Sequence, residues 1–222
     1  MVAPLLLSAA VLLAGAGCSG SSNAPAAIGS PAPSASSSPT VDAAATAALT
    51  HAESVVRSTK SFRFTATELL SGDASHATSV RGSVVRGQGV GYTLTANGRT
   101  SQVVRIAGAT YVRPVPGKWS KLRKPRPVTD PANTLLAVLR GLTAVSLRTE
   151  GAAQVVTGSL PPAAAKAALL PVASTPAQVV VTLGPSGHVA KLVVTTMSGS
   201  TNVTLTTSYT SFGRVTPLKP PV

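Results

Sequence analysis

The chain contains one cysteine, Cys18, and this single residue limits how the protein can be stabilised. One cysteine cannot form an intrachain disulfide, and zinc sites built from four cysteines, or from two cysteines and two histidines, are excluded as well. The folded part must therefore be held together by its own hydrophobic core. Roughly 180 residues follow Thr40, and a chain of that length is sufficient for one such domain.

An apolar run leads up to Cys18, and small residues stand directly before it. The run is shorter than the about 20 residues that a membrane-spanning helix needs, and its length is typical of the apolar part of a secretory signal. It resembles a bacterial lipoprotein signal peptide, in which the cysteine is lipidated and cleavage makes it the first residue of the mature chain. The alternative is a buried free cysteine, which is a common location for this residue.

This resemblance implies a chain of three parts. Residues 1–17 are the signal peptide, and residues 18–40 are the lipidated cysteine with a flexible linker rich in Ser, Pro and Ala. Residues 41–222 are the folded domain. Acyl chains such as palmitate on Cys18 would anchor the protein in the cell membrane, so the expected location is the cell envelope, on the outer face of the cytoplasmic membrane.

The chain is strongly basic. It carries 19 Lys and Arg residues against six acidic residues, which gives a formal net charge of +13 and favours binding to anionic surfaces. For an exported, lipidated protein the nearest anionic surface is the phospholipid headgroup layer, where each cation contributes about 1 kcal/mol. Nucleic acid is the other common partner of basic chains, but export and an aromatic content of only 3% argue against it.

The folded part begins with a helical pattern at residues 41 to about 60. Apolar residues recur there at intervals of three and four, which predicts a helix with one apolar stripe. The stripe consists of Ala45, Leu49, Ala52 and Val56. Thr40 is a suitable N-cap, and Asp42 suits the first turn.

The apolar period then changes to two, which indicates β-strands. Phe62, Phe64 and Ala66 alternate with polar residues, and clusters of turn-forming residues such as 71–73 and 97–98 separate several short segments. The next predicted strands cover about residues 78–86, 89–95, 101–106 and 110–113. Short strands joined by short turns indicate an antiparallel meander.

Two more helices and four more strands are predicted in the second half of the chain. Asp130 followed by Pro131 indicates a helix start, and a shorter helix is expected at residues 162–170. The apolar stripe of the first of these helices consists of Leu135, Leu136, Leu139 and Leu142. The strands cover residues 154–158, 178–183, 189–197 and 202–208. The result is one α+β domain: a helix, a curved antiparallel meander, an inserted pair of helices and further strands.

This order of elements resembles the LppX/LprAFG lipoprotein family, which is related to LolA and LolB. The matching features are Cys18, the helix before residues 61–64 (SFRF), residues 111–113 (YVR) leading to Lys118 and Trp119, the helix at Pro131, and residues 209–217 (YTSFGRVTP). The resemblance implies a half-barrel of antiparallel strands with helices across its concave face. It also implies an apolar cavity that holds acyl chains, because members are linked to carrying lipids or lipoglycans across the envelope.

Six residues on the predicted strands are candidates for the wall of such a cavity. They are Phe62, Phe64, Tyr92, Leu94, Val203 and Leu205. Small side chains elsewhere on the concave face would leave room for acyl chains, whose burial contributes about 0.8 kcal/mol per methylene. For each single residue the alternative is a well-packed core without a cavity.

The clearest charged feature is a basic run around the only tryptophan, Trp119. The run consists of Lys118, Lys121, Arg123, Lys124 and Arg126. One hypothesis is contact with a membrane or another anionic ligand, with Trp119 at the level of the headgroups and the cations on phosphates. The alternative is a solvated loop in which Trp119 caps the core.

Catalytic and metal-binding patterns are weak. The acidic residues Asp42, Glu53, Glu68, Asp73, Asp130 and Glu150 are scattered, and the histidines are His51, His76 and His188. No Gly-x-Ser-x-Gly elbow is present, although the members of a Ser/His/Asp triad need not be close in sequence. We therefore expect no enzyme activity, no cofactor and no metal site.

Together, these observations predict a monomeric, lipid-anchored envelope protein that binds an acylated lipid or lipoglycan in an apolar cavity, as a carrier or as a holder. The expected partners are this lipid, an anionic membrane surface and an envelope transporter, with no nucleic acid. The alternative is a non-catalytic scaffold or sensor lipoprotein of the same fold with a closed cavity. An exported enzyme is the third class.

Overall fold

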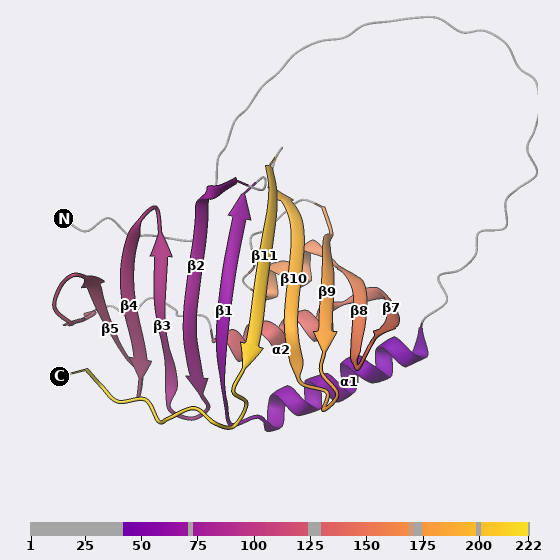
Figure 1. The fold of residues 1–222 in the computed structure, drawn as a ribbon, viewed down its shortest axis with the longest axis horizontal. Helices are drawn as coiled ribbons and strands as arrows, with labels where there is room; N and C mark the ends of the chain where they lie inside the picture. Colours follow the sequence, from indigo (N-terminus) through magenta and orange to yellow (C-terminus); the bar gives the residue numbers. More distant parts are fainter. Residues whose placement is uncertain are drawn as a thin grey trace, which may run out of the picture. The chain divides into compact units, whose positions relative to one another are not determined.

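The described residues form one open antiparallel sheet of eleven strands, with helices on one of its faces (Figure 1). The structure is a computed structural model that describes residues 42–70, 73–123, 130–168, 170, 175–198 and 201–221. Cys18 and the rest of the predicted signal peptide and linker lie outside these residues.

The elements follow one another in two groups along the chain. The first group contains α1 (Ala43–Ser58), β1 (Ser61–Leu70), β2 (Asp73–Val85), β3 (Gly89–Ala96), β4 (Arg99–Ile106), β5 (Ala109–Val115) and β6 (Ser120–Lys121). The second group contains α2 (Pro131–Gly141), β7 (Thr143–Glu150), β8 (Ala153–Leu160), α3 (Pro162–Ala167), β9 (Ala177–Leu183), β10 (Val189–Ser198) and β11 (Thr201–Thr210).

The first and last strands of the sheet pair with each other at its centre. The strand order is β6-β5-β4-β3-β2-β1-β11-β10-β9-β8-β7, so a meander lies on each side of the β1–β11 pair. Eight residue pairs join these two strands, from Arg63 opposite Thr210 to Leu70 opposite Val203. The open, curved antiparallel sheet with helices on its concave face confirms the predicted fold class.

Helix α1 begins two residues later than Thr40 would place it, because Asp42 is the N-cap. One carboxylate oxygen of Asp42 accepts a hydrogen bond from the Ala45 N–H at 2.9 Å, and the other accepts one from the Leu147 N–H in β7 at 2.8 Å. These backbone donors, Ala45 before Leu147, lower the pKa of Asp42. The predicted apolar stripe is confirmed, since Ala45, Leu49, Ala52 and Val56 are all buried.

Helix α2 confirms the predicted start at Asp130 and Pro131, with the Asp130 carboxylate accepting from the Ala132 N–H at 2.9 Å. Helix α3 ends at Ala167, three residues before the predicted end. The prediction of an inserted helical pair was wrong, because β7 and β8 lie between the two helices. Among the described residues, no helix has both the length and the apolarity needed to cross a membrane.

The predicted strands are confirmed, but the sequence did not reveal β6 and β7. Both are edge strands of the sheet, and most of their side chains are exposed. An exposed edge strand lacks the buried alternate positions that make a strand recognisable in a sequence. The predicted turn at Asn97–Gly98 joins β3 to β4, with φ of 49° and 69° at these residues, as a two-residue hairpin turn requires.

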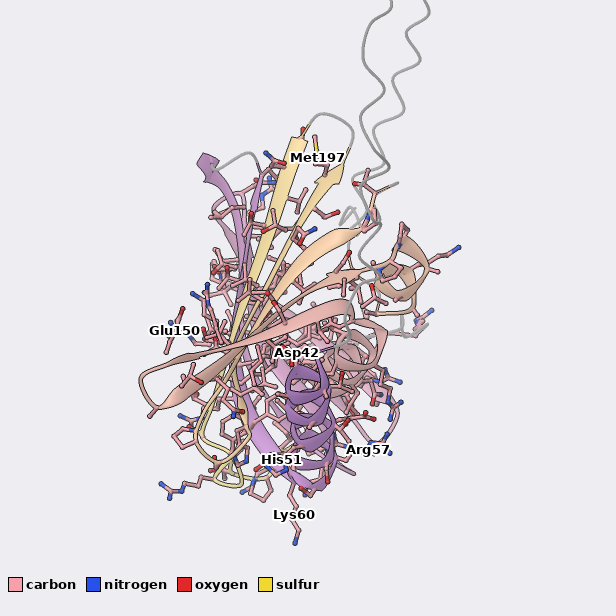
Figure 2. All side chains as sticks on the ribbon, turned by 90° about the vertical axis from the view of Figure 1, so that its right-hand side faces the viewer. Asp42, His51, Arg57, Lys60, Glu150 and Met197 are labelled. Atoms are coloured by element: carbon pink, nitrogen blue, oxygen red, sulfur yellow. The ribbon has the colours of Figure 1, made fainter. Side chains whose placement is uncertain are left out.

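The hydrophobic core lies between the helices and one face of the sheet. Leu192 on β10 is 2% exposed and belongs to the same cluster as Leu139 of α2 and Ala52 of α1. Met197 is also on β10. In Figure 2 it lies at the end of the sheet away from α1, the helix on which His51 and Arg57 are labelled. Met197 is 46% exposed, so one strand offers both a core position and a solvent position.

We expect Leu192→Ala to lower the free energy of unfolding by about 2–5 kcal/mol, because it removes a buried side chain under the helices. Met197→Ala on the same strand is the control and should change this free energy by less than about 0.5 kcal/mol. Urea denaturation followed by circular dichroism measures both. Equal effects of the two variants would contradict the position of the core.

Candidate functional site

The six residues predicted to line a cavity all lie on the helix-bearing face of the sheet. Phe64 on β1 is opposite Tyr209 on β11 and Gly82 on β2, and Gly82 is opposite Tyr92 on β3. Residues two apart on a strand share a face. The same face therefore holds the other five candidates with Phe64: Phe62, Tyr92, Leu94, Val203 and Leu205.

These six side chains differ in burial. Phe62 and Phe64 are 2% and 5% exposed and belong to the packed core beneath the helices, and Val203 is 3% exposed. Tyr92, Leu94 and Leu205 are partly exposed. The first group is part of the interior, whereas the second group is accessible to a ligand.

Partly exposed apolar side chains continue across four neighbouring strands. Ala66 on β1 is opposite Val80 on β2, and Val80 is opposite Leu94 on β3. Together with Tyr92 and Leu205 they form what we call the apolar patch: Ala66, Val80, Tyr92, Leu94 and Leu205. In Figure 1, α1 and α2 cross the lower part of the sheet, and β1, β2 and β11 extend above them. Since Val80, Tyr92 and Leu205 also pack against the core, the patch continues the core surface.

A glycine lets aromatic side chains lie close together at the lower border of the patch. A Cβ added at Gly82 would lie 2.5 Å from the Tyr92 Cβ and 2.9 Å from the Phe64 Cζ, closer than such atoms can approach. Only glycine therefore fits between these two residues. The space above Gly82 is therefore occupied by the side chains of these two neighbours, which joins the patch to the packed core.

Glu68 is the one acidic side chain that the described strands place beside the patch. It is opposite Leu205 on β11 and Thr78 on β2, on the same face as Ala66. It makes no hydrogen bond or ion pair within the described part of the chain, and burial raises the pKa of its carboxyl. A carboxyl group in these surroundings favours its neutral form more than a solvated one does.

The other described acidic side chains stabilise the fold. Asp42 and Asp130 cap helices, and Glu150 pairs with Arg148 at 2.9 Å. Glu53 pairs with Arg57 and Arg140, which joins α1 to α2, and these hydrogen bonds, Arg57 first, lower its pKa. The side chain of Asp73 lies outside the described part. Four of the carboxylates are thus already engaged in capping or ion pairing.

The described histidines do not gather at the patch. His51 lies on the exposed side of α1, and His188 stacks on Phe212 with ring centroids 4.2 Å apart. The Nδ1 atom of His188 is 2.8 Å from the Ser186 hydroxyl. The side chain of His76 is not described. Among the described residues, no three His, Cys, Asp or Glu side chains are close enough to hold a metal ion.

The basic run lies at the β5–β6 edge, and the structure describes part of it. Lys118, Lys121 and Arg123 are exposed, and Trp119 is partly buried outside the main core cluster, so it does not act as a core cap. Lys124 and Arg126 lie outside the described residues. Tyr111, which pairs with Lys121, is opposite Val104 and so lies on the outer face, away from the helices. The structure therefore separates the basic residues from the apolar patch.

A hollow of about 640 Å³ lies beside the exposed side of α1, away from the patch. Its described lining consists of Ala43, Thr46, Ala47, Thr50, His51 and Ser54. These are small or neutral side chains from a single helix face. They offer no convergent charged groups, so we do not include this hollow in the candidate site.

Two solved structures share this architecture. LprF from Mycobacterium bovis superposes with a TM-score of 0.59 at 12% identity, over 80% of this chain and 97% of that chain. The lipoprotein LppX from Mycobacterium tuberculosis superposes with a TM-score of 0.52 at 15% identity, over 80% of this chain and 100% of that chain. No protein-family model and no curated protein matches the sequence. At this identity the similarity shows a shared fold, and it confirms the half-barrel that the sequence resemblance implied.

Sequence reasoning missed three residues of the site: Ala66 and Val80 as members of the patch, and Glu68 beside it. Ala66 was recognised only as part of an alternating strand. One signal for two of them was present in the sequence: Ala66 and Glu68 are spaced at steps of two from Phe62 and Phe64, which places all four on one face of a strand. Strand pairing was needed to show that Val80 and Leu205 flank them.

Replacing Glu68 by Gln should stabilise the fold at neutral pH. The raised pKa means that the folded state holds its proton to higher pH than the unfolded state, so stability falls as pH rises above the ordinary glutamate value of 4.5. The melting temperature of Glu68→Gln should therefore exceed that of the unchanged protein at about pH 7, and the two should converge near pH 4.

Glu150→Gln is the matched control, because Glu150 is exposed and paired with Arg148. We expect no gain in melting temperature from this variant at either pH. A Glu68→Gln protein that is less stable at neutral pH would show that the carboxylate is favourably solvated or paired.

Proposed function

We propose that this protein is a lipid-anchored envelope protein that binds an acylated lipid or lipoglycan on its concave face and carries it across the envelope. The observation that supports this most strongly is the apolar patch. It joins the hydrophobic core at one side and is partly exposed at the other. A contiguous exposed apolar surface of this kind is typical of a binding site.

The physical chemistry of the patch fits acyl chains. Methylene groups gain about 0.8 kcal/mol each when they leave water, and this gain needs apolar surface but no catalytic group. The side chains of Val80, Leu94 and Leu205 supply such surface on three strands. About ten buried methylenes would contribute roughly 8 kcal/mol, which is enough to compete with a bilayer for one lipid.

The proposed anchor is consistent with this role. Lipidation of Cys18 would hold the protein at the outer face of the cytoplasmic membrane, close to the source of acylated lipids. The net charge of +13 favours approach of the domain to anionic headgroups. An acceptor such as an envelope transporter would then take the cargo.

A scaffold or sensor with a closed cavity is the second candidate, and the packing of Phe62 and Phe64 favours it. These two aromatic side chains fill the concave face beneath the helices, with 2% and 5% exposure. If the whole face closed in this way, the fold would bind partners rather than lipid.

Lipid binding by residues 41–222, which form one compact unit with its own core, distinguishes the two candidates. We expect native mass spectrometry of this unit, produced in a bacterium with related envelope lipids, to show about one acylated lipid per chain. Leu94→Asp and Leu205→Asp should each lower lipid occupancy by at least about tenfold, because a charge on the patch opposes acyl burial.

Thr93→Asp and Thr206→Asp are the matched controls. Each introduces the same charge one residue away, on the outer face of the same strand, and should leave lipid occupancy unchanged. A lipid-free mass for the unchanged protein, with no uptake from added micelles, would contradict the carrier and favour the scaffold or sensor.

A further inference from the structure

A hollow of about 480 Å³ lies on the outer face of the sheet, at the edge formed by β5 and β6. The residues of its lining that matter here are Tyr111, Arg113, Lys118, Trp119, Lys121 and Pro221. Tyr111 and Arg113 are two apart on β5, and Lys121 pairs with Tyr111 across the two strands. The backbone therefore brings these side chains to one face, opposite to the apolar patch.

Arg113 is held in a fixed position within this hollow. Its Nη2 donates a hydrogen bond to the Gln102 side chain, and its guanidinium carbon lies 5.0 Å from the centre of the Trp119 ring. Its Nε is buried and has no hydrogen-bond partner in the structure. A guanidinium that is oriented by two neighbours holds its remaining Nη donors in a fixed arrangement, which favours binding of an acceptor.

The charge of the hollow has one sign. Arg113, Lys118 and Lys121 supply three cations to its lining. The described lining includes no carboxylate to neutralise them. Like charges gathered in a concave site raise the local concentration of anions.

The C-terminal segment forms one side of the hollow. The Leu218 N–H donates to the Gln88 side chain at 3.1 Å, and a Cβ added at Gly91 would lie 3.3 Å from the Leu218 Cδ2. Figure 1 shows this segment crossing from β11 past the ends of β2, β3 and β4. It thereby brings Pro221 to the hollow beside Trp119.

We propose that this hollow binds the phosphate of a phosphomonoester or phosphodiester through Arg113, Lys118 and Lys121. Arg provides a fork of donors that matches phosphate oxygens, and the lysines add point charges. The volume exceeds that of a phosphate ion and accommodates the attached glycerol of a headgroup. This phosphate site deepens the membrane contact of the proposed function and is independent of acyl binding, because it lies on the other face of the sheet.

Trp119 is the only tryptophan of the chain, so its fluorescence reports directly on the site. Residues 41–222 would be titrated, at constant ionic strength, with inorganic phosphate, glycerol 1-phosphate, acetate, vesicles of phosphatidylcholine, and vesicles containing phosphatidylglycerol. We expect a saturable change with the phosphate compounds or with the phosphatidylglycerol vesicles, and none with acetate. A response to the vesicles alone identifies a membrane headgroup as the ligand, and a response to the dissolved phosphates alone identifies a soluble one.

Arg113→Gln and Lys121→Gln test the residues, and Arg81→Gln is the control. Arg81 is an exposed cation on the outer face of β2, outside the hollow. Affinity should fall at least about tenfold in the first two variants and less than about twofold in the control. Equal losses in all three, equal responses to acetate and phosphate, or no saturable response would overturn the proposal. Lipid occupancy of Arg113→Gln, measured by mass spectrometry, should stay unchanged, which separates this site from the apolar patch.

Discussion

The pairing of β1 with β11 is the constraint on which the rest of the structure depends. It joins two meanders, one on each side, into a single sheet in which hydrogen-bonded strands follow one another without a break from β7 to β6. Phe62 and Tyr209 support this junction, with ring centroids 5.7 Å apart in an edge-to-face arrangement, and burial raises the pKa of Tyr209. Because the paired strands are far apart in sequence, the sheet depends on long-range contacts rather than local ones.

The continuous sheet separates two chemistries onto two faces. The concave face holds the core where the helices cover it and the apolar patch where Val80, Leu94 and Leu205 are partly exposed. The outer face of β5 holds Arg113 and Tyr111 beside the basic residues of the β5–β6 edge. The proposed acyl-binding site and the proposed phosphate site therefore lie on opposite faces of the sheet.

The sequence predicted the parts of the fold that bury an alternating or helical stripe. The alternation at Phe62 and Phe64 located β1, and the stripe of α1 was correct residue by residue. It could not locate β7, because an exposed edge strand has no buried pattern to read. The sequence also does not determine the strand register. The position of Glu68 beside the patch, and that of Arg113 over the Trp119 ring, were therefore found only in the structure.

Binding of an acyl chain on the concave face is tested most directly by mapping where the bound chain touches the protein. Residues 41–222 would be loaded with a lipid that carries a photoreactive diazirine on its acyl chain, irradiated, and analysed by peptide mass spectrometry. We expect adducts on Val80, Leu94 and Leu205 of the concave face. Adducts on Thr93 or Thr206 of the outer face, or on the exposed side of α1, would contradict it.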